Sequence, residues 1–108
     1  MEIRKLGINE AVGVLKDRKK FKNVVIEAIE YLINKKGDSD VHIIRVKEIL
    51  QIIKEMIGIK NSQYDKRISV RIGIVLNDLG IETFNTARGK EFIISRTEFE
   101  MIRNANKK

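Results

Sequence analysis

The residues of this chain best suited to chemistry are cations and hydrogen-bonding side chains at the start of one predicted helix. Lys66, Arg67, Ser69 and Arg71 lie within six positions, and Arg67 and Arg71 are spaced to share a helix face. Lysine and arginine pair with phosphates, and the guanidinium fork of arginine can bond two acceptors of guanine. A helix N-terminus also favours anions through its free amides and its dipole. The pattern predicts contact with a polyanion. Asn77, near the C-terminal end of the same predicted helix, could bond an adenine or be a plain surface residue.

Two further groups of cations point the same way. Arg88 and Lys90 flank Gly89 at the tip of a predicted hairpin, where a short basic turn suits a phosphate or a narrow minor groove. Around Lys19 and Lys20, five positive charges fall in seven positions, which suits phosphate steering without sequence information. A solvated turn and a solvated helix junction are the alternative interpretations of these two groups.

Residue types that support catalysis or hold a metal are few. The chain has no cysteine, and its one histidine, His42, lies in a predicted loop where a capping or partly packed role is expected. Asp38 and Asp40 indicate a loop and a helix start rather than a metal site. No phosphate-binding glycine motif and no serine nucleophile motif is present. We therefore expect a protein that is not an enzyme and that acts without a cofactor or metal.

Composition sets the class of protein. The sequence has 108 residues, 43% of them hydrophobic, and a net charge of +7. This length indicates one domain with a modest core, and the apolar runs are far shorter than the roughly 20 residues of a membrane span. The first residues form no apolar stretch of signal-peptide length, so we expect a soluble cytoplasmic protein. The excess charge lies toward both ends and favours nucleic acid, an acidic membrane face or an acidic protein as partner.

Hydrophobic spacing predicts three helices in the middle of the chain. They cover residues 21–36, about 43–57 and about 65–79. Gly58 and Gly80 stand where glycine ends a helix, and the stretch between the second and third helices is polar. Asp65 and Ser69 are alternative N-caps of the third helix.

Past the third helix, the pattern changes to the alternation of strands. Residues 81–86 and 91–95 predict a two-stranded hairpin. Because a lone ribbon is marginal, we expect Phe84, Phe92 and Ile94 to pack on the helices.

Short helices are predicted at both ends of the chain. At the N-terminal end, Ile8, Val12 and Leu15 would line a helix capped by Asn9. At the C-terminal end, Thr97 and the glutamate three residues later form a capping-box pattern.

The order of three helices followed by a basic hairpin resembles the winged helix-turn-helix family of DNA-binding domains. The stretch from Ser69 to Ser95, SVRIGIVLNDLGIETFNTARGKEFIIS, carries the resemblance most specifically. The resemblance as a whole covers residues 21–96. It implies an α+β, mostly helical fold with a three-helix core and a two-stranded wing. Residues 1–20 would be a basic segment with a short helix, and residues 97–108 a helix with a basic tail.

The resemblance implies that the third helix lies in the major groove of double-stranded DNA and that the wing follows the backbone or minor groove. We expect sequence-specific or semi-specific binding by a transcriptional regulator or an accessory protein of replication. Gly73 and Ile74, uncharged residues off the inward face of that helix, favour the alternative of a protein–protein interaction module. Apolar residues in segments 3–15 and 99–102 indicate a homodimer, or else ends that fold back on the core of a monomer.

Overall fold

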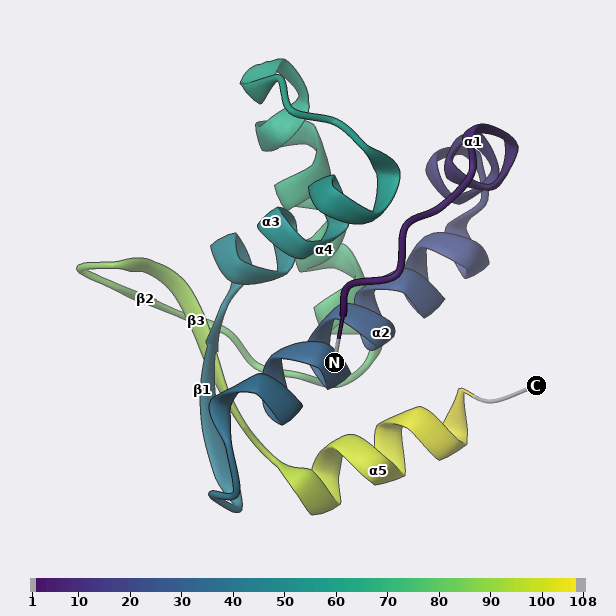
Figure 1. Ribbon diagram of the computed structural model, residues 1–108. Coiled ribbons are helices and arrows are strands. Elements are labelled where there is room, and N and C mark those ends of the chain that lie inside the picture. Colours follow the sequence, from purple (N-terminus) through teal and green to yellow (C-terminus); the bar gives the residue numbers. More distant parts are fainter. Residues whose placement is uncertain (1, 107–108) are drawn as a thin grey trace.

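The computed structural model describes residues 2–106 and has an α+β fold in which helices pack on one face of a small antiparallel sheet (Figure 1). The elements in chain order are α1 (Ile8–Lys16), α2 (Arg18–Lys36), β1 (Val41–Arg45), α3 (Val46–Ile57), a 3-10 turn η1 (Ser62–Tyr64), α4 (Asp65–Asp78), β2 (Phe84–Thr86), β3 (Gly89–Ser95) and α5 (Arg96–Ala105). Within residues 2–106, no helix is both long enough and apolar enough to cross a membrane.

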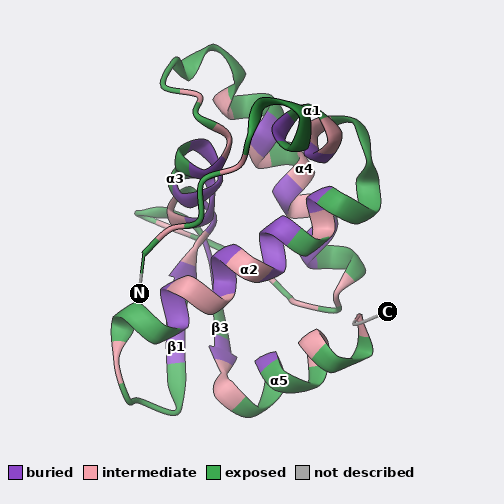
Figure 2. Cartoon of the chain, turned by 45° about the vertical axis from the view of Figure 1, so that its right-hand side comes forward, coloured by how far each residue is buried: buried purple, intermediate pink, exposed green. Residues whose placement is uncertain are grey.

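Helix α2 runs through the middle of the molecule and carries much of the core (Figure 2). Its buried residues recur at intervals of three and four, as predicted, and Phe21 and Ile29 are each 1% exposed. The helix begins three residues earlier than expected because Asp17 caps it. The Asp17 carboxylate accepts hydrogen bonds from the backbone amides of Lys19 and Lys20, at 2.9 and 3.1 Å.

The stretch before α3 is a strand, and the prediction that a helix begins near Ile43 was wrong. Residues 41–45 pair antiparallel with β3, Ile43 opposite Ile93. His42 is therefore in a strand rather than a loop, and it is only 4% exposed. Strand pairing with a segment about fifty residues later leaves no trace in local helical spacing, which explains the error.

The sheet has the order β1-β3-β2, so the predicted hairpin is two strands of three. Phe92 and Ile94 are buried against the helices as expected. Phe84 is 42% exposed, contrary to the prediction, because it lies opposite Glu91 on the other face of the sheet. The turn is also tighter than the predicted tip, since Gly89, with φ 105°, already belongs to β3.

Helix α4 begins at Asp65, directly after the 3-10 turn. Neither predicted N-cap was right: Asp65 is the first helical residue and Ser69 lies inside the helix. The Asp65 carboxylate instead pairs with the ammonium of Lys54 on α3, at 2.8 Å. Gly58 and Gly80 follow α3 and α4 as predicted, with left-handed φ angles of 77° and 79°.

Both terminal helices form, with caps and faces that differ from the prediction. Helix α1 begins after Gly7 without a side-chain cap, so Asn9 does not cap it. It buries Ala11 and Val14, while Ile8 on the predicted inner face is 84% exposed.

The N-cap of helix α5 is Ser95, two residues before the predicted cap at Thr97. The Ser95 hydroxyl accepts from the Glu98 amide at 3.0 Å, and the Glu98 carboxylate accepts from the Ser95 amide at 3.1 Å. Thr97 therefore lies within the helix rather than at its start.

Some apolar residues of the two terminal segments pack on the core of their own chain, and others are exposed. Phe99 is buried, and Ile3, Leu6 and Ile102 pack against the core. The N-terminal segment is also bonded to α3 through the Leu6 amide, which donates to the Met56 carbonyl at 2.8 Å. Ile8, Val12 and Met101 of the same segments are 84%, 43% and 68% exposed.

We predict that Ser95→Ala lowers the free energy of unfolding by about 1 kcal/mol, because an orphan amide at the start of α5 loses its acceptor. Thr97→Ala, within the helix, should change it by less than about 0.5 kcal/mol. Urea unfolding of the two variants tests this. A larger loss at Thr97 than at Ser95 would contradict the observed cap.

Candidate nucleic-acid interface

A groove of about 910 Å³ separates α4 from the start of α3 and from the hairpin, and it gathers four of the predicted contact residues: Lys66, Ser69, Asn77 and Lys90. The other residues that line the groove come from the same elements and from the link before β2. They are Val46, Lys47, Leu50, Asp65, Val70, Gly73, Ile74 and Thr83.

Helix and strand periodicity explain why these side chains meet. Helix α4 buries Ile68, Ile72, Val75 and Leu76 against the core. Lys66, Ser69 and Asn77 fall on the part of the helix that turns toward the hairpin. Lys90 is two residues before buried Phe92 on β3, so it points to the helix side of the sheet.

The groove is basic because its one carboxylate is already engaged. Asp65 is held by Lys54, whose side chain is 10% exposed. Within residues 2–106, Lys47, Lys66 and Lys90 form no ion pair with a carboxylate. Lys47 was missed as a contact residue. It lies outside the three groups of cations singled out in the sequence, and only the packing of α3 beside α4 brings it to the groove.

A second basic surface lies on the other side of α4, around a pocket of about 560 Å³. Lys19 lines it together with Arg18, Lys22 and the side chain of Arg71, which outnumber its carboxylate, Asp78. Lys20, one residue further on, is exposed, and its ammonium lies next to Gly13 of α1. The basic junction predicted from the sequence therefore faces α4 only in part.

Arg71 does not lie free beside Arg67 as their spacing suggested. Its guanidinium carbon is 4.1 Å from the centre of the Phe21 ring, and its Nη1 donates to the Leu15 carbonyl at 2.9 Å. Burial lowers the pKa of Arg71 from its ordinary value, although an arginine remains charged near neutral pH. Arg71 thus joins α4 to the junction of α1 and α2, whereas Arg67 is exposed.

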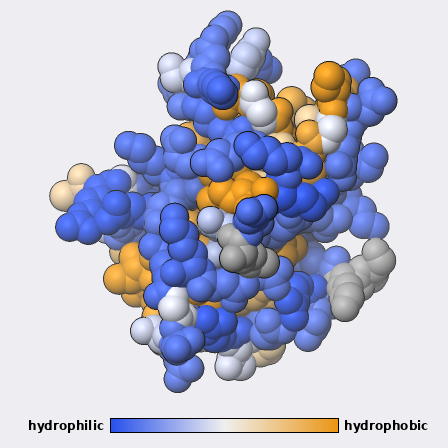
Figure 3. Space-filling model, viewed as in Figure 1, coloured by the Kyte–Doolittle hydropathy of each residue, from blue (hydrophilic) through white to orange (hydrophobic). Residues whose placement is uncertain are grey.

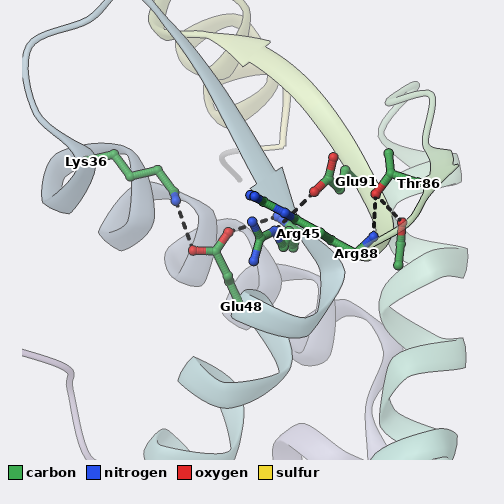
Figure 4. A network of polar contacts seen from close by, with 7 residues as sticks. Lys36, Arg45, Glu48, Thr86, Arg88 and Glu91 are labelled. Atoms are coloured by element: carbon green, nitrogen blue, oxygen red, sulfur yellow. Dashed lines mark hydrogen bonds and ion pairs between the residues drawn. The ribbon is translucent and has the colours of Figure 1, made fainter.

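The turn of the hairpin does not bring Arg88 and Lys90 to one site. Arg88 lines a separate depression with Lys36, Arg45 and Glu48 (Figure 4), whereas Lys90 lines the groove. Its backbone amide donates to the Thr86 hydroxyl at 3.1 Å, which holds the turn closed.

Between its two basic sides, α4 exposes a stripe without charge. Val70 is 56% exposed and Ile74 is 48% exposed, with Gly73 beside them. Ile74 lines both the groove and the second pocket. The helix therefore presents an apolar strip with cations on each side of it.

Comparison of the chain with protein-family models, curated proteins and solved structures found no match.

We predict that Arg71→Ala lowers the free energy of unfolding by about 1–2 kcal/mol, because it removes both the cation–π contact and the hydrogen bond to Leu15. Arg67→Ala removes an exposed cation from the same helix and should cost less than about 0.5 kcal/mol. Thermal unfolding of both variants is the measurement. Equal stabilities would show that Arg71 does not join α4 to the α1–α2 junction.

Proposed function

We propose that this chain is a winged helix-turn-helix domain that binds double-stranded DNA, with α4 in the major groove and the β2–β3 hairpin as a wing along the backbone. One observation carries the proposal: cations lie on both sides of the exposed stripe of α4. Lys47, Lys66 and Lys90 lie on one side. Arg18, Lys19 and Lys22 lie on the other.

That arrangement suits a helix inside a duplex groove. The major groove is about 12 Å wide, so a helix within it has a phosphate backbone on each side. Cations on both flanks can then contact both strands, which fixes the register of the helix without reading sequence. A helix that bound a polyanion along one edge would need cations on that edge alone.

The stripe between the cations supplies the groups that would meet base edges. Apolar side chains contact the thymine methyl group, and an asparagine can bond adenine. Val70 and Ile74 supply the apolar contacts and Asn77 the amide. A·T base pairs are therefore the preferred target of α4. The protein that binds them would be either a transcriptional regulator or an accessory protein of replication.

We expect duplex binding to weaken with salt along a log–log slope of about −5, for five or six phosphate contacts. Lys66→Ala combined with Lys90→Ala should reduce the magnitude of that slope by about 2 and weaken binding to all sequences alike. Lys5→Ala combined with Lys35→Ala removes the same charge elsewhere and serves as the control. Fluorescence anisotropy over a salt series measures the affinity for the duplex and its salt slope. Equal losses of affinity in the two double variants would contradict an interface at α4.

We also expect deoxyuridine in place of thymine to weaken binding about fourfold for each contacted methyl group, since one buried carbon is worth about 0.8 kcal/mol. The substitution changes no other group of the duplex. Ile74→Ala should lower the sensitivity to this exchange, while Arg67→Ala should leave it unchanged. Equal affinities for the two duplexes would mean that the stripe does not meet thymine.

The exposure of Val70 and Ile74 also favours a second candidate function, a protein–protein interaction module in a replication or transcription assembly. Apolar surface on a helix is typical of contacts between proteins as well as of contacts with thymine. The salt series separates the two functions. Absence of duplex binding near physiological salt would reject the first and support the second.

A further inference from the structure

The pocket of about 560 Å³ lies where the first turns of α2 meet α4 and the end of α5. In Figure 1 and Figure 2, the beginning of α2 and the end of α5 lie on the same side of the molecule. Pockets that hold small molecules have volumes of about 300–1,000 Å³, and they combine apolar side chains with a few polar groups. This pocket has the size of such a site.

Apolar side chains from three helices contribute to the lining. Ile74 of α4 and Ala105 of α5 are both exposed there. Phe21 and Val75 also line the pocket, although they are only 1% and 7% exposed, so they lie at its base. A molecule that enters the pocket therefore meets apolar groups at the base and on two sides.

Apolar surface by itself does not identify what binds it. The outer face of the sheet also exposes apolar residues, among them Ile43 and Ile93, which lie opposite each other in the strand pairing. Apolar surface lies over the sheet at the left of Figure 3. The charges beside an apolar surface restrict its occupant, and at the pocket these charges are mostly of one sign.

Cations predominate in the pocket. Arg18, Lys19, Lys22 and Arg71 line it, and within residues 2–106 none of them forms an ion pair with a carboxylate. Among the described residues, the one carboxylate of the lining is Asp78, which is exposed and is joined to none of these cations. The pocket therefore attracts an anion.

Arg71 is the cation best placed to hold that anion. The Phe21 ring and the Leu15 carbonyl, described above, fix its guanidinium in position. A guanidinium has five N–H donors, and within residues 2–106 only Nη1 of Arg71 has an acceptor. Burial lowers the pKa of Arg71, and no carboxylate among those residues offsets that cost. A fixed guanidinium with donors to spare suits the two oxygens of a carboxylate.

A duplex phosphate would account for the exposed cations of the pocket but not for its apolar lining. The cations of α2 form the flank that the proposed function assigns to phosphates, and Arg71 is not part of that flank. A phosphodiester backbone carries no hydrocarbon chain or ring that could fill the space between Ile74 and Ala105. A fixed guanidinium beside apolar groups instead matches a molecule with an anionic end and an apolar body.

We propose that this pocket binds a small organic carboxylate, whose charged end pairs with Arg71 and whose apolar body lies between Ile74 and Ala105. The exposed cations at the start of α2 attract the anion without fixing its orientation. The inference goes beyond the proposed DNA binding and does not depend on it, because the pocket is formed by the chain alone.

Octanoate, acetate and octanol are the probes, since acetate has the charge without the chain and octanol has the chain without the charge. Each is titrated into the isotope-labelled whole chain without DNA, and NMR shifts of the backbone amides report the site and the affinity. We expect octanoate to bind with a dissociation constant of about 1 mM or lower and to shift the amides of Phe21, Ile74 and Ala105 most. Acetate and octanol should each bind at least about tenfold more weakly.

Three variants test the role of charge. Arg71→Met keeps an unbranched side chain beside the Phe21 ring and removes the guanidinium, so it should weaken octanoate binding at least about tenfold. Lys22→Met leaves Arg71 in place and should weaken binding about threefold. Lys35→Met removes the same charge at the other end of α2 and should leave the affinity unchanged. If Arg71→Met does not fold, as judged by circular dichroism, the comparison of Lys22→Met with Lys35→Met decides.

Three results would overturn the inference. Absence of octanoate binding up to about 10 mM would show that the pocket does not take such a molecule. Equal affinities for acetate and octanoate would show that the cations bind charge alone. Equal effects of Lys22→Met and Lys35→Met would place the binding elsewhere. None of these results alters the duplex affinity measured by anisotropy, so this inference and the proposed function fail separately.

Discussion

The pairing of β1 with β3 is the interaction on which both surfaces of this protein depend. It joins the end of α2 to the hairpin and makes β3 the central strand. On the inner face it buries Ile44 and Phe92, each 0% exposed, beneath α3. Because β3 is held there, Lys90 points toward α4 and Ile93 points away from it. One strand pairing therefore positions a basic groove on one side and an apolar patch on the other.

A high positive charge constrains how such a chain uses its surface. Cations that pair with carboxylates, as Lys54 does with Asp65, fix one element against another and leave no attraction for an outside anion. Among residues 2–106, Lys47, Lys66 and Lys90 beside α4 have no such carboxylate partner. The apolar outer face of the sheet has two ion pairs at its border, and Arg88 lies beside them. The chain thus carries a basic surface at α4 and an apolar surface on the outer face of the sheet.

Features decided by neighbouring residues could be predicted from the sequence, while those decided by distant ones could not. The spacing of α2 and the glycines at 58 and 80 depend on a few adjacent residues, and they were confirmed. The hairpin was found for the same reason, although β2 is shorter than predicted. Strand β1 was missed because its partner is far along the chain. The cap of α5 was misplaced by two residues because Ser95 and Thr97 each have a glutamate three positions later.

For the candidate site, the sequence by itself determined which residues carry charge and which helix and hairpin hold them. Only the tertiary structure decided what each side chain meets. It turned Arg71 onto Phe21, sent Arg88 and Lys90 to opposite sides of the hairpin, and brought Lys47 to the groove. The physical reason is that helical spacing and strand alternation depend on the covalent order of residues. The direction in which a face points depends on which elements pack together, and that follows from burial of the whole core.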